Sequence, residues 1–236
     1  FFNLIISLFI KRYLLVDVVY QPLMKNTYNF FNLNVVICVK CLNLHITKNR
    51  MIEYFQTNDD KYRDALIALY IGCFSSGISA QYIDEDQLSD YIDFILNKGY
   101  GVLAIENELL VAALLCFPLK YDKDVPIEIT DNYNVDNCIY IAELMVTEQK
   151  RGFGIAKKMM EEFENKLDTN VTDLFIRVWD KNVPALTLYE KQGFTSVATI
   201  LQHKLEKDGA NLLLMRKMYL NKKVSISYEE INHKNY

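Results

Sequence analysis

The sequence of 236 residues contains little glycine and proline, eight and four residues, which excludes a collagen-like fibre. Its five cysteines are too few for a small domain held together by disulfides. Hydrophobic residues make up 51% of the chain and charged residues 24%, a composition that excludes a disordered tail. We therefore expect a chain that buries enough apolar surface to form a stable core of its own.

Glycine and acidic residues are scarce in the first fifty residues. This segment has no glycine, six Lys and Arg residues and one acid, Asp17, whereas residues 51–236 hold 20 basic and 29 acidic residues, a net charge of −9. Neither apolar run of residues 1–20 reaches the length of about 20 residues that a membrane span needs. The basic pair that follows the first run does not fit a secretory signal.

The composition changes at Met51 and divides the chain there. We expect an N-terminal extension over 1–50, one domain over 51–220 and a polar C-terminal tail over 221–236. Two interpretations of the extension stay open: a short strand-rich segment with a strand at 35–39, or a sequence upstream of a natural start at Met51.

One motif in the extension is typical of half a zinc site, because Cys38 and Cys41 are followed by His45. A zinc module needs a second pair of ligands at suitable spacing, and none follows. The remaining cysteines each stand alone in an apolar segment: Cys73, Cys116 and Cys138. We expect no metal site, and free thiols that suit a reducing cytoplasm.

Hydrophobic periodicity predicts helices and strands in mixed order from residue 59 onward. The expected helices cover 59–76, 84–97, 152–167 and 184–191. The expected strands cover 100–105, 109–119, 138–146, 174–179, 194–201 and 211–219. A polar, acidic loop over 122–137 is expected to border a site. This order, without a repeat or a linker, predicts one α/β domain.

A turn with two glycines follows the strand that ends at residue 146. Gly152 and Gly154 stand at the start of an amphipathic helix, so several backbone N–H groups and the positive end of the helix dipole point to one place. Arg151 adds a cation, and the arrangement is typical of a phosphate or pyrophosphate site. No Walker A pattern is present, and Lys157 stands where the dinucleotide fingerprint requires a third glycine. Taken alone, a Gly-x-Gly turn is more often only a tight turn.

Two motifs resemble those of the GCN5-related N-acetyltransferase (GNAT) superfamily. Arg151-Gly-Phe-Gly-Ile-Ala156 is similar to its acyl-CoA signature, [QR]-x-x-G-x-[GA], which the register beginning at Gln149 also satisfies. Asn182-Val-Pro-Ala-Leu-Thr-Leu-Tyr-Glu-Lys-Gln-Gly-Phe194 is similar to its second motif, N-x-x-A-x-x-[LF]-Y-x-x-x-G-F. The resemblance covers the predicted domain but not the extension. It implies a GNAT-like α/β fold, with a mixed, mostly antiparallel central sheet, helices on both faces and a V-shaped splay between the two central strands.

By this resemblance, acetyl-CoA lies in the gap between the strand ending near Val146 and the next strand along the chain. Exposed backbone groups around Met145, Val146 and Thr147 would pair with the pantetheine like an added strand. The amides that would hold the pyrophosphate belong to Arg151, Gly152, Phe153, Gly154, Ile155 and Ala156. Asn182 and Ala185 would border the pantetheine or the thioester.

Two side chains are candidates for catalysis, one from the resemblance and one from its place in a strand. Tyr189 matches the position of the family's general acid, and its ordinary pKa of about 10 keeps it protonated at neutral pH. Glu143 is the candidate base, acting through water, because a carboxylate inside an apolar strand is costly unless it is paired or functional. Strand alternation places Glu143 on the same face as Met145. The alternatives are a core aromatic for Tyr189 and a structural salt bridge for Glu143.

The implied function is transfer of an acetyl group from acetyl-CoA to a primary amine by direct attack on the thioester, with no metal. A non-catalytic acyl-CoA-binding or sensing module is the alternative, and a site for a different nucleotide is the third interpretation. The net charge of −9 disfavours nucleic acid and mildly favours a cationic small molecule or a peptide amine as acceptor. Residues 84–97 and 122–137 are expected to wall the acceptor side. We expect a cytoplasmic monomer or homodimer without a membrane partner.

Overall fold

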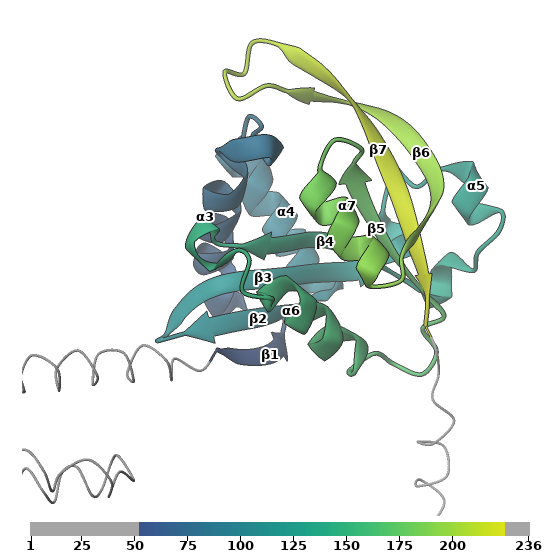
Figure 1. The fold of residues 1–236 in the computed structure, drawn as a ribbon, viewed down its shortest axis with the longest axis horizontal. Helices are drawn as coiled ribbons and strands as arrows, with labels where there is room; N and C mark the ends of the chain where they lie inside the picture. The colour runs from purple at the N-terminus through teal and green to yellow at the C-terminus, as the bar shows by residue number, and fades with distance from the viewer. Residues whose placement is uncertain (1–51, 225–236) are drawn as a thin grey trace, which may run out of the picture. The chain divides into compact units, whose positions relative to one another are not determined.

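A seven-stranded sheet runs through residues 52–224, the part of the chain that this computed structural model describes (Figure 1). The strand order is β1-β2-β3-β4-β5-β7-β6, and all neighbouring strands are antiparallel except β4 and β5. The strands are β1 (Glu53–Thr57), β2 (Tyr100–Glu106), β3 (Leu109–Pro118), β4 (Cys138–Val146), β5 (Asp173–Trp179), β6 (Thr195–Leu205) and β7 (Leu212–Lys223). This mixed α/β architecture confirms the predicted fold class. The strand expected at 35–39 and the cysteine motif after it lie outside the described residues.

Helices cover both faces of the sheet. α3 (Arg63–Phe74) and α4 (Glu85–Lys98) lie on one face, and α6 (Ile155–Glu164) and α7 (Val183–Lys191) lie on the other (Figure 1). A short helix, α5 (Ile127–Thr130), lies beside β6. Five 3-10 turns lie at Asp60–Tyr62, Gly77–Ser79, Leu119–Tyr121, Val135–Asn137 and Glu148–Lys150. No helix within residues 52–224 has the length and apolar character needed to cross a bilayer.

Each face of the sheet has its own hydrophobic core, because successive side chains of a strand point to opposite faces. In β3, Leu115 and Phe117 face the core under α3 and α4. Their neighbours Leu114 and Cys116 face the core under α6 and α7. Burial on both faces explains why β3 forms a nearly unbroken apolar run in the sequence.

Local signals in the sequence determine both ends of α4. The Asp84 carboxylate caps the helix by accepting a hydrogen bond from the Gln87 amide (3.0 Å). After the last turn, Gly99 passes so close to β3 that a Cβ there would lie 1.8 Å from the carbonyl oxygen of Cys116. Only glycine fits this contact, which holds α4 against the sheet with Tyr91 packed onto the core.

β4 and β5 run side by side for only part of their length. Their ladder has four residue pairs and ends at Ile141 and Ile176, although β4 continues to Val146 and β5 to Trp179. The outer edges of both strands stay paired beyond that point, β4 with β3 and β5 with β7. The sheet therefore opens into the predicted V-shaped splay, and no described strand lies between the two inner edges.

Two elements, β1 and α6, differ from the sequence prediction. β1 pairs with β2 at one edge, and alternation did not predict it because Glu53, Gln56 and Thr57 leave it largely polar. α6 begins at Ile155, three residues later than expected, because the two glycines of the preceding turn have left-handed φ angles.

The β6–β7 hairpin is longer than predicted. β6 extends to Leu205, and β7 extends to Lys223, three residues past the expected end of the domain at 220. On β6, Gln202 and Lys204 lie on the more buried face, whereas Leu201 is 68% exposed on the other. This inverted distribution of polar and apolar residues hides the strand from a periodicity argument.

Candidate active site

The turn between β4 and α6 presents a row of unused backbone donors. Gly152 and Gly154 have φ angles of +80° and +78°, which glycine adopts without strain. No described residue accepts a hydrogen bond from the amides of residues 152–157, and the first helical bond runs from the Lys158 amide to the Gly154 carbonyl (3.0 Å). A Cβ added at either glycine would meet open space. Together with the α6 dipole, this geometry suits an anion such as a phosphate.

The predicted residues of this turn differ in their exposure. Ile155 is buried as the first residue of α6, and Ala156 is half-buried behind it. The exposed residues are Arg151, Gly152, Phe153 and Gly154. The side of the turn that faces solvent therefore consists of backbone groups and the side chains of Arg151 and Phe153.

The inner edge of β4 leads to this turn. The Thr147 amide donates to the Val111 carbonyl of β3 (3.0 Å). Because hydrogen-bonded positions alternate along an antiparallel ladder, the amide and carbonyl of Val146 point the other way, toward the gap. The Val146 carbonyl accepts a hydrogen bond from Arg151 Nε (3.2 Å). Of the three backbone positions predicted around the pantetheine, only Val146 has this orientation, while Met145 and Thr147 pair with β3.

An irregularity in β4 determines the direction of Glu143. Leu115 pairs with Glu143 and Cys116 pairs with Ile141, so Ala142 is an extra residue that forms a β-bulge. Beyond the bulge the alternation of faces is reversed relative to the start of the strand. Glu143 consequently lies on the face covered by α3 and α4.

Glu143 lies in an environment that is partly apolar and partly cationic. The Tyr91 hydroxyl of α4 donates to Glu143 Oε1 (3.0 Å). Burial raises the pKa of Glu143, while the charges of Lys204, Lys217 and Arg177 and the Tyr91 hydrogen bond act in the opposite direction. Within residues 52–224 no cation forms a direct ion pair with Glu143. The structural salt bridge considered for it is therefore not formed there.

Tyr189 reaches the gap from α7, on the opposite face of the sheet. Its side chain is only 7% exposed and its ring packs against Phe194, with 6.1 Å between ring centroids. Burial and the negative charge of Glu143 both raise the pKa of Tyr189. The Tyr189 hydroxyl has no hydrogen-bond partner among the described residues. Among the same residues, the one fully buried side-chain polar atom that lacks a hydrogen bond is Asp180 Oδ1. The Tyr189 hydroxyl is therefore not completely buried, although its ring belongs to the core under α6 and α7.

The second motif begins at the N-terminus of α7. Asn182 caps this helix by accepting a hydrogen bond from the Ala185 amide (3.4 Å), and its side-chain nitrogen donates to Ser79 Oγ (3.3 Å). Asn182 thus connects α7 to the 3-10 turn that follows α3. Asn182 precedes the first helical residue, Val183. Of the motif residues that lead to Tyr189, only Ala185 therefore lies with it on the helix itself.

No sequence motif points to the charged group that lies on the α3–α4 face beside Glu143. Arg177 of β5 donates to Asp124 Oδ2 (2.8 Å) and to the Tyr219 hydroxyl (2.9 Å). The Tyr219 hydroxyl in turn donates to Asp122 Oδ2 (2.7 Å). Both aspartates belong to the acidic loop that was expected to border a site. These residues are far apart in the sequence, so only the fold brings them together.

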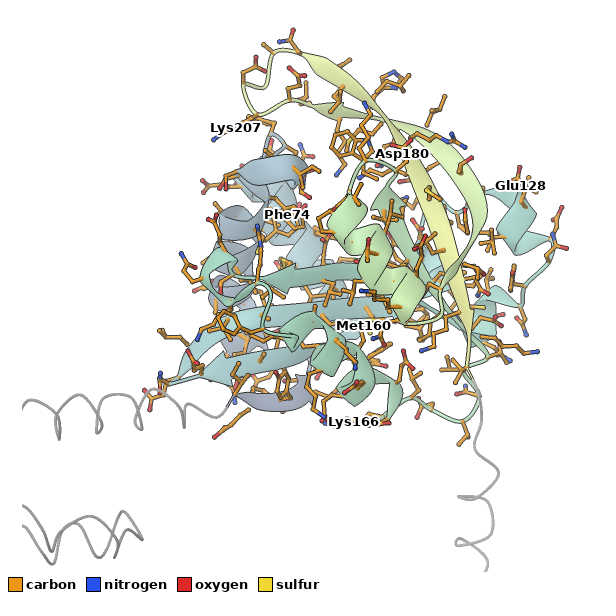
Figure 2. The ribbon with its side chains drawn as sticks, viewed as in Figure 1. Phe74, Glu128, Met160, Lys166, Asp180 and Lys207 are labelled. Carbon is orange, nitrogen blue, oxygen red and sulfur yellow. The ribbon has the colours of Figure 1, made fainter. Side chains whose placement is uncertain are left out.

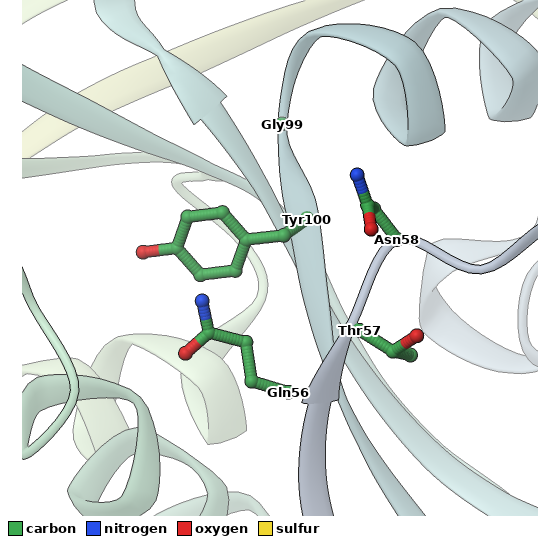
Figure 3. Close-up of a pocket in the computed structure, with 5 residues that line it drawn as sticks. All are labelled: Gln56, Thr57, Asn58, Gly99 and Tyr100. Carbon is green, nitrogen blue, oxygen red and sulfur yellow. The ribbon is translucent and has the colours of Figure 1, made fainter.

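Two hollows of similar size lie outside the gap. One, of about 350 Å³, opens at the β1 edge of the sheet (Figure 3) and is lined by Gln56, Thr57, Asn58, Gly99 and Tyr100. It has no carboxylate, imidazole or ammonium group and is separated from β4 by β3, so we assign it no part in the chemistry. The other, of about 360 Å³, lies at the turn of the β6–β7 hairpin, where Figure 2 labels Lys207. It is lined by Ala80, Glu206, Lys207, Asp208 and Leu213.

The parted sheet, with an unobstructed glycine turn at its open end, is the arrangement that the resemblance to acyl-CoA-dependent N-acyltransferases implies. Within residues 52–224 no group of three His, Cys, Asp or Glu side chains is arranged to hold a metal ion. The sequence matches the model of the acetyltransferase (GNAT) family over residues 63–194, more than half of the chain. The chain therefore belongs to the GNAT family and is an N-acetyltransferase that uses acetyl-CoA.

Solved structures of other proteins share this fold. Arabidopsis thaliana NAA60, in complex with a bisubstrate analogue, is 19% identical with a TM-score of 0.57, over 75% of this chain and 100% of that one. Salmonella typhimurium yncA, with its cofactor acetyl-CoA, is 10% identical with a TM-score of 0.56, over 75% and 96%. The Escherichia coli ribosomal-protein-S18-alanine N-acetyltransferase is 14% identical with a TM-score of 0.54, over 76% and 97%. No curated protein sequence matches the chain.

Proposed function

We propose that the protein transfers the acetyl group of acetyl-CoA to a primary amine by direct attack of the amine on the thioester, without an acyl-enzyme. The parting of β4 and β5 carries this proposal, because it offers an extended acyl donor a backbone edge beyond Ile141. The bisubstrate analogue in the NAA60 structure supports a single site in which donor and acceptor meet.

Backbone groups hold the donor in this proposal. The amides of residues 152–157 and the Arg151 side chain bind the pyrophosphate, since they have no described hydrogen-bond acceptor apart from the Val146 carbonyl that Arg151 contacts. The edge at Val146 pairs with the pantetheine, while Met145 and Thr147 keep that edge straight through β3. Asn182 and Ala185 border the same arm from the start of α7.

Two proton transfers accompany the reaction. The amine nitrogen forms a bond to the carbonyl carbon, the carbon–sulfur bond breaks, and CoA leaves as a thiolate. Glu143 accepts the amine proton through a water molecule, and Tyr189 donates its phenolic proton to the sulfur. The two groups reach the gap from opposite faces of the sheet, so Glu143 can act on the amine while Tyr189 acts on the sulfur. Exchange with solvent restores both groups.

The pKa shifts agree with these roles. A raised pKa makes the Glu143 carboxylate a stronger base, and the Tyr91 hydrogen bond and the nearby cations favour its ionised form. Burial raises the pKa of the Tyr189 phenol, which keeps its proton in place before the reaction. A thiolate formed in the same gap is also a stronger base than in water, which keeps the difference between the pKa of the phenol and that of the thiol from widening through burial alone.

Measuring thiol release from acetyl-CoA with a panel of amines tests the proposal, and calorimetric titration measures donor binding separately. We expect acetyl-CoA to bind and thiol to appear only when an amine is present. Failure to bind acetyl-CoA overturns the proposal. Binding without transfer to any amine of a broad panel would instead favour the sensing module.

A further inference from the structure

The cations around Glu143 differ in how their charges are balanced. Arg177 has two carboxylate partners, Asp122 at 3.7 Å and Asp124 at 2.8 Å. Lys204 and Lys217 have none, because no carboxylate within residues 52–224 lies in ion-pair distance of either ammonium group. The acceptor side of the gap therefore contains two ammonium groups without a direct carboxylate partner, although the charge of Glu143 acts on both.

Both lysines lie on the same face of the β6–β7 hairpin. Lys217 pairs with Ile200, which packs against the core under α3 and α4, and Lys204 lies four residues further along β6 on the same face. Lys204 donates a hydrogen bond to Gln81 Oε1 (2.8 Å), whereas Lys217 has no hydrogen-bond partner among the described residues. The charges of both act on Glu143, so the two ammonium groups face the compartment of the candidate base.

These two ammonium groups are also costly to the protein. Burial lowers the pKa of Lys217 to about 8, and the charges of Lys204 and Arg177 act in the same direction. Burial lowers the pKa of Lys204 as well. A half-buried cation without a direct ion pair destabilises a fold, so two of them beside a candidate active site indicate a ligand that brings a carboxylate into direct contact.

Solvent has access to this face of the hairpin. The hollow of about 360 Å³ at the hairpin turn includes Leu213, the cross-strand partner of Lys204. Figure 1 shows the hairpin bending away from the sheet toward the end of α3, where the Tyr82 amide donates to the Leu205 carbonyl (3.2 Å). A small molecule or the end of a peptide can therefore approach Lys204 from outside the sheet.

We propose, resting on the function proposed above, that the amine acceptor carries a carboxylate, which Lys217 and Lys204 bind while the amine faces Glu143. Two kinds of acceptor have this chemistry: a free amino acid with its α-carboxylate, and a peptide with an acidic residue next to its reacting amine. The proposal reverses the mild preference for cationic acceptors that the net charge suggests, because the two ammonium groups on the acceptor side have no direct carboxylate partner.

Pairs of acceptors that differ only in this charge test the subsite. One arm compares free amino acids with their carboxamides, and the other compares peptides with Glu or Gln in the second position. In at least one arm we expect kcat/KM to favour the carboxylate by about tenfold or more, the usual size of a charge-assisted hydrogen bond. This preference should disappear in Lys217→Gln and in the Lys217→Gln, Lys204→Gln double variant.

The matched control is Arg216→Gln, which removes a cation from the outer face of the same hairpin and should keep the preference. A lysine that only adjusts the ionisation of Glu143 would change kcat/KM for both members of a pair equally, so the ratio within a pair isolates carboxylate binding. Equal rates within every pair for the unaltered protein overturn the subsite. A preference that survives in the double variant overturns it as well.

A second measurement does not require turnover. Calorimetric titration in the presence of CoA compares N-acetylglycine and N-acetylglycinamide for binding to the unaltered protein and to the double variant. Stronger binding of the carboxylate that is lost in the double variant supports the subsite, and equal binding of the two compounds overturns it. Failure of acetyl-CoA to bind in a separate titration overturns the proposed function instead, so the two failures are distinguishable.

Discussion

The two sides of the gap between β4 and β5 are built from different parts of the chain. The proposed donor side consists of backbone groups, the edge at Val146 and the amides of residues 152–157. The proposed acceptor side consists of side chains on four strands and a loop, with Glu143 and Arg177 at its centre. A backbone site leaves a signature of glycines in one short segment, whereas a side-chain site depends on residues that the fold collects from distant positions.

The largest expected effect concerns the ion pairs of the acceptor side. Arg177→Met leaves the buried Asp122 without its cation, and we expect the free energy of unfolding to fall by about 3 kcal/mol, because an unpaired buried charge is strongly destabilising. Chemical denaturation measures the loss. The Arg177→Met, Asp122→Asn double variant should lose less than the sum of the single variants. Additive losses would show that the acceptor side does not depend on this pairing.

The next effect concerns Tyr189, the side chain proposed to protonate the leaving CoA thiolate. Tyr189→Phe removes the proposed acid, and we expect kcat to fall by about 100-fold or more with an unchanged Kd for acetyl-CoA. Steady-state kinetics and calorimetric titration measure the two quantities. Tyr100→Phe is the control, because this half-buried tyrosine lies on β2, which β3 separates from β4. Undiminished turnover of the Tyr189 variant would remove the acid assignment.

A substitution in the glycine turn tests whether the donor side depends on backbone alone. Gly154→Val introduces a branched side chain at a φ of +78°, and we expect the Kd for acetyl-CoA to rise by about tenfold through strain and lost access to the amides. Gly209→Val is matched in conformation, with a φ of +69°, but lies in the turn of the β6–β7 hairpin, away from the residues assigned to the donor. It should lose similar stability and keep the donor affinity. Equal affinities of the two variants would contradict the donor site.

The smallest effect is a dependence of stability on pH. The pKa of Glu143 is raised in the folded protein, so folding favours its protonated form, and the stability from this group is lost as pH rises through the folded pKa. Glu143→Gln should therefore match the original protein below its ordinary pKa of 4.5 and exceed it in Tm at neutral pH. Melting curves between acidic and neutral pH measure the difference. The exposed Glu190→Gln is the control, and a constant difference across this range would contradict the prediction.

Much of the fold could be predicted because regular side-chain patterns set it. β4 has the predicted limits, 138–146, and the amphipathic core of α6 follows the predicted glycine turn. The bulge at Ala142 could not be predicted, since one extra residue in an apolar strand has no compositional signal. The V-shaped splay and the proposed role of Tyr189 came from the resemblance of two motifs, and the proposed role of Glu143 came from its place as a carboxylate inside an apolar strand.

The acceptor side shows why the remaining features were out of reach. Lys204 and Lys217 are unremarkable in the sequence, and their common face depends on the register of a hairpin that periodicity predicts to be shorter. The pairing of Arg177 with Asp122 connects residues 55 positions apart across a parallel crossover. Net charge also misleads here, because an average over the chain does not describe the few charges that surround Glu143.

The free inner edge of β4 also makes the acyl donor a partner in folding. A donor that pairs with this edge binds the folded chain and not the unfolded one, so mass action shifts the folding equilibrium toward the native state. At a free concentration of 100 times its Kd, the donor adds about 2.7 kcal/mol to the free energy of unfolding. The resistance of the protein to unfolding and proteolysis therefore follows the supply of its acyl donor, before any acceptor has been encountered.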